Sequence, residues 1–211
     1  MKIRFIGDVH GKYNRYKDVI RDTPKSIQVG DMGVGFISLK NGEISYQANP
    51  PYDNMSKGDH KFIRGNHDNP EACKGQAFWI PDGTLTEDGV FCVGGATSVD
   101  KIWRTEGFDW WADEELSDEE LEKIIQKYSE AKPELVCTHE CPESIANEII
   151  ATYNMTKIKD LSRTRLALER MFAIHQPKFW VFGHWHKTIA FQRNKTVFQC
   201  LNELDFIDKE I

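Results

Sequence analysis

Five short apolar runs in this chain end in the same way, and this repeated ending limits the possible folds more than any other feature. Four runs are followed by a glycine and then a polar side chain, and the fifth has a threonine in place of the glycine. Short β-branched and aromatic runs predict strands, and open α/β sheets carry their sites beyond the carboxyl ends of their strands. We therefore expect five strands that bring polar side chains together. The segments read IRFIGDVHG, SIQVGDMG, KFIRGNHD, ELVCTHECP and KFWVFGHWH.

Helical patterns lie between these segments. Apolar residues recur at helical spacing between residues 13 and 20. Ser117 and Glu120 form an S-x-x-E capping box ahead of a second helix, and Ser162 can cap a third. Near the C-terminus, a tight turn at Asn194 joins two further strands in a hairpin. The alternation of strands and helices predicts a layered α/β fold.

Length and composition bound the organisation of the chain. A length of 211 residues suits one domain with a sizeable core, and we expect residues 1–211 to form it, with a Trp-rich, acidic insertion near 97–131. The net charge of −6 disfavours nonspecific binding to nucleic acid. The five cysteines are scattered and lack a C-x-x-C pair, which predicts reduced thiols rather than disulfides or a zinc site.

No apolar run approaches the roughly 20 residues that cross a bilayer. The N-terminus, MKIRFIGDVH, has no charged leader followed by a long apolar segment and a cleavage site. We therefore expect a cytoplasmic protein that has no membrane partner.

The polar residues after the five runs are candidate metal ligands. Asp8 and His10 are separated by one residue, as are His184 and His186, and an extended backbone directs residues i and i+2 to the same side. Three oxygen donors and four imidazoles suit Mn, Fe, Ni or Zn rather than Mg or Ca. Seven ligands exceed the number that one ion takes from a protein, so we expect two ions bridged by one carboxylate, that of Asp31. The seven candidates are Asp8, His10, Asp31, Asn66, His139, His184 and His186.

The five segments also resemble a known family. In order and spacing, GDVHG, GD, GNHD, TH and GHWH are similar to the five motifs of the calcineurin-like metallophosphoesterases, over residues 7–186. The resemblance implies the metallo-dependent phosphatase fold, an α/β/β/α sandwich in which two central mixed β-sheets are flanked by helices. The segment GGATSVDKIWRTEGFDWWADEELS further resembles small bacterial and phage members of the superfamily.

The resemblance implies a role for each candidate residue. His67 matches the family's catalytic histidine, and Asp68 matches the residue that orients it. The implied cofactor is a pair of divalent transition metal ions, with Mn favoured over Fe, Ni and Zn. The first ion would be held by Asp8, His10, Asp31 and His186, and the second by Asp31, Asn66, His139 and His184.

These assignments predict the reaction. Two ions roughly 3.5–4 Å apart activate a bridging hydroxide that attacks a phosphomonoester or phosphodiester, and His67 donates a proton to the leaving group. Arg104 and Arg64 are candidate substrate-binding residues because guanidinium binds phosphate bidentately. The second motif reads GDMGVGF and lacks the Asp-Arg pair of protein Ser/Thr phosphatases, so the substrate is expected to be a small molecule or nucleotide.

Two other functions stay open. A nuclease or nucleic-acid end phosphatase would use Trp110 and Trp111 to stack on bases. A metal-binding scaffold without turnover needs ligands but no proton donor, so the presence of His67 and Asp68 counts against it. Glu140 stands where many family members have a small residue or a second histidine, and the sequence assigns it no role.

Overall fold

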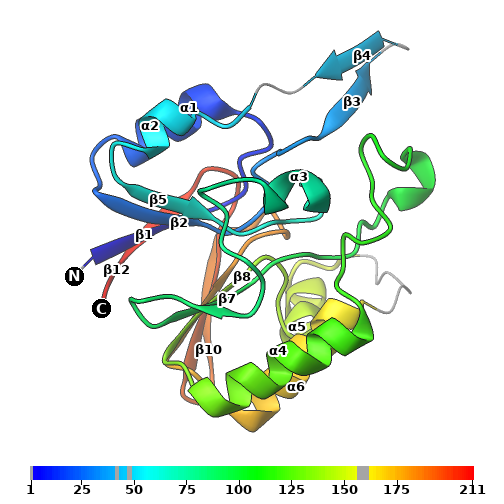
Figure 1. Ribbon diagram of the computed structural model, residues 1–211. Coiled ribbons are helices and arrows are strands. Elements are labelled where there is room, and N and C mark those ends of the chain that lie inside the picture. The colour runs from blue at the N-terminus through cyan, green and yellow to red at the C-terminus, as the bar shows by residue number, and fades with distance from the viewer. Residues whose placement is uncertain (1, 41–42, 47–48, 156–161) are drawn as a thin grey trace.

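The computed structural model describes residues 2–40, 43–46, 49–155 and 162–211. Two β-sheets stack in the middle of the molecule, and helices cover the outer face of each sheet (Figure 1). Each sheet contains both parallel and antiparallel pairs of strands. The predicted α/β fold, with two central mixed sheets flanked by helices, is confirmed.

The smaller sheet holds the first three ligand-bearing segments. Its strand order is β12-β1-β2-β5, in which β1, β2 and β5 run parallel and β12 pairs antiparallel with β1. A separate two-stranded sheet, β3 (Ile37–Lys40) and β4 (Glu43–Tyr46), extends away from the layers (Figure 1). The strands of the smaller sheet are β1 (Lys2–Ile6), β2 (Lys25–Gln28), β5 (Asp59–Phe62) and β12 (Phe206–Glu210).

The larger sheet holds the other two ligand-bearing segments, in the strand order β10-β11-β9-β8-β7-β6. The strands β7, β8, β9 and β11 run parallel, and antiparallel strands close both edges. The predicted C-terminal hairpin is present as β10 and β11, with Asn194 in the left-handed conformation at its turn. The strands are β6 (Thr84–Leu85), β7 (Val90–Val93), β8 (Leu135–Thr138), β9 (Phe179–Phe182), β10 (Ile189–Arg193) and β11 (Thr196–Cys200).

The three helices that the sequence predicts, α1, α4 and α6, begin where expected. The capping box of Ser117 and Glu120 is formed at the start of α4, and the Ser162 side chain accepts a hydrogen bond from the Arg165 amide at the start of α6. Among the described residues, no helix combines the length and apolar character needed to span a bilayer. The helices are α1 (Tyr13–Ile20), α2 (Tyr52–Met55), α3 (Pro70–Lys74), α4 (Asp118–Ala131), α5 (Glu143–Thr152), α6 (Arg163–Ile174) and a 3₁₀ turn, η1 (Lys101–Trp103).

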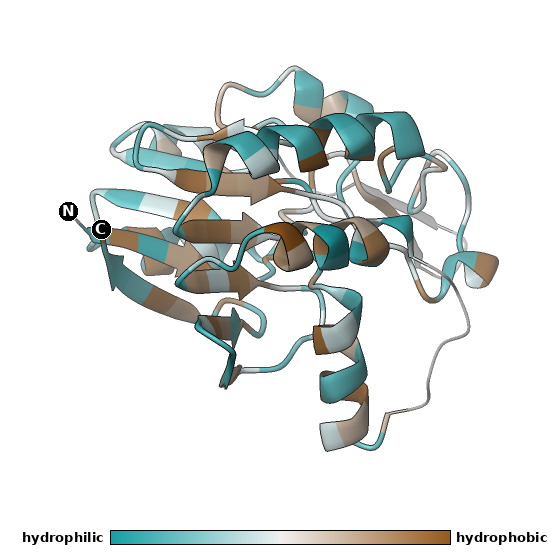
Figure 2. Cartoon of the chain, turned by 90° about the horizontal axis from the view of Figure 1, so that it is seen from below, coloured by the Kyte–Doolittle hydropathy of each residue, from teal (hydrophilic) through white to brown (hydrophobic). Residues whose placement is uncertain are grey.

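Strand β9 explains how the layers are held together. Phe179 and Val181 point into the core between the sheets, whereas Trp180 and Phe182 pack under α4, α5 and α6. Each fully buried side chain of this kind contributes about 1.5–3 kcal/mol to folding. Figure 2 shows hydrophobic residues gathered on the strands and hydrophilic ones on the outer turns of the helices. A continuous apolar run is therefore expected for a strand covered on both faces.

The five cysteines support these cores as small apolar side chains. All five are buried, and none forms a disulfide. Cys92 and Cys137 lie between the sheets, and Cys141 and Cys200 lie under the helices of the larger sheet. The predicted absence of a disulfide framework is confirmed.

Candidate metal centre

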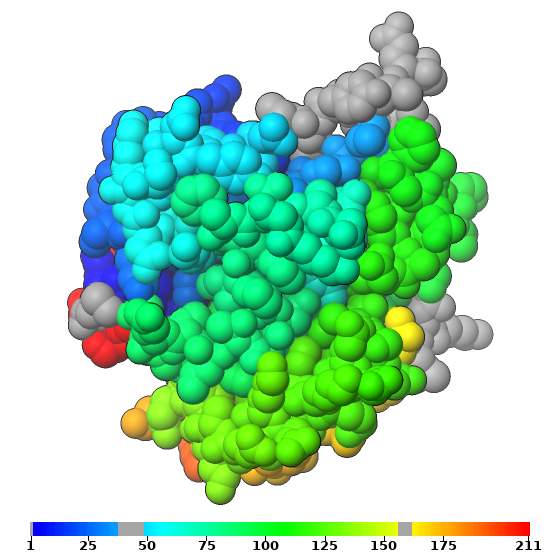
Figure 3. Space-filling model, in the orientation of Figure 1, coloured from blue at the N-terminus to red at the C-terminus, as the bar shows by residue number. Residues whose placement is uncertain are grey.

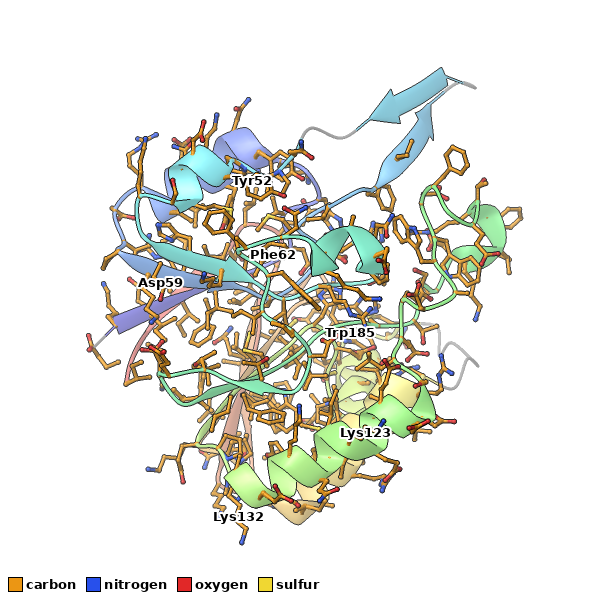
Figure 4. All side chains as sticks on the ribbon, viewed as in Figure 1. Tyr52, Asp59, Phe62, Lys123, Lys132 and Trp185 are labelled. Carbon is orange, nitrogen blue, oxygen red and sulfur yellow. The ribbon has the colours of Figure 1, made fainter. Side chains whose placement is uncertain are left out.

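The five ligand-bearing segments converge at one end of the two sheets. Each segment begins immediately or shortly after its strand, and the strands β1, β2, β5, β8 and β9 all run in parallel pairs within their sheets. Their carboxyl ends therefore meet at the same edge. Figure 4 shows Trp185, from the segment after β9, in the interior between the two halves of the molecule. Lys123 of α4 and Lys132, which follows α4, lie on the outside.

The first group of side chains consists of Asp8, His10 and His186. The Nε2 atoms of His10 and His186 are 3.0 Å apart, and His186 Nε2 lies 3.2 Å from Asp8 Oδ2. Potential ligand atoms of all three residues lie within 4.8 Å of one another. Asp8 is fully buried and also accepts a hydrogen bond from the His184 amide, which ties the two segments together.

The second group consists of Asp31, Asn66, His139 and His184. His139 Nε2 lies 3.3 Å from Asp31 Oδ1 and 3.1 Å from Asn66 Oδ1, and the His139 and His184 rings are 5.1 Å apart. Ligand atoms of Asp31, His139 and His184 again lie within 4.8 Å of one another. All seven ligands predicted from the sequence are thus found in two adjacent groups.

Asp31 stands between the two groups. Its Oδ1 faces His139, and its Oδ2 lies 3.7 Å from His10 Nε2. One oxygen is therefore directed to each group, which is the geometry that a bridging carboxylate requires.

The donor atoms fit bound cations. His139 Nδ1 lies 2.9 Å from the Val29 carbonyl, which can only accept, so Nδ1 carries the hydrogen and the Nε2 lone pair faces two oxygens. Such an arrangement is repulsive unless a proton or a metal ion lies between the atoms. In the first group, the Nε2 atoms of His10 and His186 converge beside the Asp8 carboxylate, so a proton or a metal ion is required between these atoms as well. An imidazole whose other nitrogen donates to a carbonyl is the usual form of a metal ligand.

The pKa values of two histidines also indicate that the second group favours a positive charge. Burial opposes protonation of His139, but the Asp31 carboxylate outweighs burial and raises the pKa of His139 to about 10. Burial and the neighbouring His139 lower the pKa of His184 to about 3. The second group therefore gathers one proton on His139 where a divalent ion would supply the charge instead.

Left-handed backbone, and not extended backbone, directs the ligands inward. His10, Asp31, His184 and His186 have φ of 47°, 58°, 64° and 49°. The expected i and i+2 alternation is therefore wrong, although each pair does converge. Non-glycine residues in this conformation are strained by about 1–3 kcal/mol each, and such strain clusters at functional sites.

Two glycines of the motifs permit the close approach of the segments. A Cβ atom at Gly65 would overlap the Asp31 carboxylate, and one at Gly183 would overlap that of Asp8. The glycine that precedes the ligand in these segments is thus required by the carboxylate of another segment.

A family model identifies the family of this chain. The family model of calcineurin-like phosphoesterases matches residues 1–188. The chain belongs to the calcineurin-like phosphoesterases. No curated protein matches it significantly. Among solved structures it is similar to GAP50, the anchor in the inner membrane complex of Plasmodium, at 13% sequence identity and a TM-score of 0.47, over 95% of this chain and 71% of that chain.

Membership of the calcineurin-like phosphoesterases gives the two groups of side chains a general function. The family and the clustered ligands together support metal-dependent hydrolysis of a phosphoester. The predicted family resemblance is confirmed.

His67 of the phosphoesterase lies beside both groups. Its ring stacks on Phe36 at 4.9 Å, and its Nε2 is 2.8 Å from an Nη atom of Arg104. Because arginine only donates, His67 Nε2 accepts in this contact and carries no hydrogen. Burial and the Arg104 charge lower the pKa of His67 to about 4, although Asp31 opposes them. The structure thus brings together His67, the catalytic candidate, and Arg104, a substrate-binding candidate, with His67 neutral.

The resemblance implies that Asp68 orients the His67 ring, but the hydrogen bonds of Asp68 go to the backbone instead. Its buried carboxylate accepts hydrogen bonds from four backbone amides at 2.6–3.2 Å, three in the segment after Asp31 and one at Gly65. The role is structural, because these bonds fix the loops that carry Asp31 and Asn66. The sequence could not distinguish the two roles, since both require an aspartate at this position.

We expect Asp68→Asn to destabilise the fold by about 3 kcal/mol, because an amide NH₂ facing backbone N–H groups leaves buried donors unpaired. Urea unfolding measures the change. The exposed Asp53→Asn serves as the control, with a change within about 0.5 kcal/mol. Equal midpoints for the two variants would refute the structural role of Asp68.

Arg64 is not brought to the metal centre. Its side chain is 3% exposed, and the guanidinium pairs with Asp82 at 2.8 Å and donates to the Glu114 carbonyl at 2.8 Å. The interpretation of Arg64 as a phosphate ligand is therefore not supported by its position.

A cavity of about 420 Å³ opens above the two groups. Asp31, His67 and His184 form part of its floor, and Arg104 lies at its wall. Glu140, for which the sequence predicts no role, also lines the cavity. It is buried and accepts hydrogen bonds from the Trp185 indole at 2.7 Å and the Cys141 amide at 2.8 Å. Glu140 therefore anchors the loop that carries His184 and His186.

Proposed function

We propose that this phosphoesterase hydrolyses a small phosphomonoester or phosphodiester at a dinuclear metal centre. The observation that carries the proposal is the convergence of seven candidate ligands in two adjacent groups, with one Asp31 oxygen directed to each group. The groups lie at the floor of one cavity. The same residues give each ion three or four protein ligands, which is the usual number.

The cofactor is proposed to be two divalent transition metal ions, with Mn favoured by the mixed oxygen and imidazole donors. When bound, the ions supply an activated water nucleophile and positive charge for the phosphoryl oxygens. The protein contributes buried carboxylates, whose charge favours cations, and imidazoles held by carbonyl and amide partners. The first ion is assigned to Asp8, His10, Asp31 and His186, and the second to Asp31, Asn66, His139 and His184.

His67 is proposed to donate a proton to the leaving group. In the protein alone its Nε2 is occupied by Arg104, so the substrate must displace this contact. A phosphoryl group between Arg104 and His67 satisfies both side chains: it accepts from the guanidinium, and its charge favours protonation of the imidazole. Arg104 is held for this purpose by Asp100 at 2.7 and 2.9 Å.

A small or nucleotide-like substrate is supported by the dimensions of the cavity. About 420 Å³ accommodates a small ligand. Val99 and Met155 supply apolar walls for a leaving group. Stacking of bases on Trp111, as a nuclease would require, is not supported, because Trp111 is 7% exposed and packs on Phe36.

The proposal also covers the organisation of the chain. Residues 1–211 are proposed to act as one cytoplasmic domain. Support for a single domain comes from α4, which packs on α6 and belongs to the helix layer over the larger sheet. The shorter segment before it, around residue 105, packs against the chain that leads into β3 (Figure 3), where the Ile37 amide donates to the Phe108 carbonyl.

Removal of the metal is expected to abolish turnover. We expect elemental analysis to give two ions per chain, and dialysis against a chelator to remove both ions and all hydrolysis of an aryl phosphate monoester and diester. Added Mn²⁺ should restore the activity. Circular dichroism before and after dialysis shows whether the fold survives. A folded preparation with at most one ion per chain, or with no activity on any phosphoester, would exclude the proposed function.

A further inference from the structure

The segment that follows β7 reaches the metal centre, although it carries no metal ligand. Ser98 lies on this segment and is 1% exposed. The Asn66 Nδ2 group donates to Ser98 Oγ at 3.0 Å, and Ser98 Oγ donates to Glu114 Oε2 at 2.5 Å. The Ser98 amide donates to the other carboxylate oxygen at 2.8 Å. These three residues form a buried hydrogen-bonded chain that ends at a proposed ligand.

The direction of this chain decides which way the Asn66 amide faces. Glu114 is a carboxylate with both oxygens accepting, so the single Ser98 hydroxyl hydrogen is committed to it. Ser98 Oγ can then only accept from Asn66, which requires the NH₂ group of Asn66 on that side. If the Asn66 amide were flipped, two oxygens would face a hydroxyl that has one hydrogen. The Asn66 Oδ1 is therefore directed toward His139, where the second ion is proposed to bind.

Separate contacts hold the Glu114 end of the hydrogen-bonded chain in place. Arg64 donates to the Glu114 carbonyl at 2.8 Å and pairs with Asp82, so the backbone of Glu114 is held by a residue two positions before Asn66. Arg64, Asn66 and Glu114 are each at most 4% exposed. Little room is left for the carboxylate to turn away from Ser98.

We propose that Glu114 and Ser98 are positioning residues that orient the Asn66 amide for metal binding. Outer partners of metal ligands typically change metal affinity 10- to 100-fold when replaced. The inference rests on the proposed dinuclear centre. It gives a function at the site to the acidic segment before α4, which the sequence predicts only as part of a Trp-rich, acidic insertion.

The test compares Glu114→Gln and Ser98→Ala with the wild-type protein by dialysis against buffered Mn²⁺ and elemental analysis. Glutamine can donate to Ser98, which would reverse the chain and flip Asn66. We expect each variant to raise the Kd of one ion 10- to 100-fold and to leave the other ion bound as before. The double variant should bind the affected ion no more weakly than Ser98→Ala alone, because both changes break the same hydrogen-bonded chain.

Glu115→Gln is the matched control. Glu115 is the next residue, is also buried and accepts from Ser162 Oγ and the Thr164 amide instead of from a partner of a ligand. It should leave both Kd values unchanged. An equal effect of Glu115→Gln, or additive effects in the double variant, would reduce the observation to general packing and overturn the proposal.

Asn66→Ala tests the proposed ligand set separately from the positioning role of Ser98 and Glu114. If Asn66→Ala weakens one ion while folded Ser98→Ala and Glu114→Gln do not, only the positioning role is overturned. If Asn66→Ala leaves both ions bound as tightly as in the wild type, the proposed ligand set itself fails. Circular dichroism and the melting temperature establish whether each variant is folded. If Glu114→Gln is not folded, the result for Ser98→Ala, the smaller change, decides whether the proposal holds.

Discussion

Asp31→Asn is expected to reduce the metal content from two ions per chain to at most one and to lower turnover to that of the metal-free protein. The two Asp31 oxygens face different groups, at 3.3 Å from His139 and 3.7 Å from His10. An asparagine has one oxygen and directs an NH₂ group at the other side. It also lacks the charge that offsets two divalent ions in a buried site. Elemental analysis and turnover of an aryl phosphate measure both effects.

The matched control is Asp82→Asn. Asp82 is also an aspartate with a cationic partner, Arg64, and its side chain is 9% exposed, but it lies outside both groups of ligands. Asp82→Asn should lower stability and retain both ions. Two tightly bound ions in Asp31→Asn would mean that the ions do not share this carboxylate, and the dinuclear arrangement would have to be redrawn.

His67→Ala is expected to retain both ions and to lose about 10²–10⁴-fold in turnover, the range for loss of a general acid. The loss should depend on the leaving group. An alkyl phosphate needs the proton, whereas a nitrophenyl ester departs as a stable anion, so the alkyl ester should lose much more. Comparing kcat for the two esters in variant and wild type measures this difference.

His67 is also close enough to His10 and Asp31 to contribute a ligand atom, so metal content decides between two roles. If His67→Ala loses an ion, His67 is a ligand and the division between ligands and acid is wrong. An equal loss of turnover on both esters would instead indicate a role in binding. His175→Ala is a suitable control, because His175 lies at the end of α6 and contacts the Pro133 carbonyl.

The sequence predicts the ligand set because each ligand directly follows a strand. Strand identity and chain order are local properties, and parallel strands bring their ends together without further information. The direction of each ligand is not local. His184 and His186 converge through left-handed backbone, which depends on the fit of Gly183 against Asp8, and that contact joins segments 175 residues apart along the chain.

Roles that depend on partners from elsewhere in the chain could not be predicted from the motifs. Asp68 and Arg64 stand beside ligands in the sequence, yet their side chains bind backbone groups that come from other segments. The link from Asn66 to Glu114 spans 48 positions and has no periodic pattern. Strand β12 was also not predicted, because its residues, such as the half-exposed Phe206, follow no apolar alternation and pair only with the edge of β1.

The proposed ligands come from both sheets: β1, β2 and β5 belong to one, and β8 and β9 to the other. Bound ions would therefore act as a cross-link between the two halves of the fold, besides their part in hydrolysis. Each ion that binds only the native state adds about 2.7 kcal/mol of stability when its free concentration is 100 times its Kd. Metal supply and protein lifetime would then be linked. A cell short of the ion would lose the enzyme itself to unfolding and proteolysis, in addition to losing its turnover.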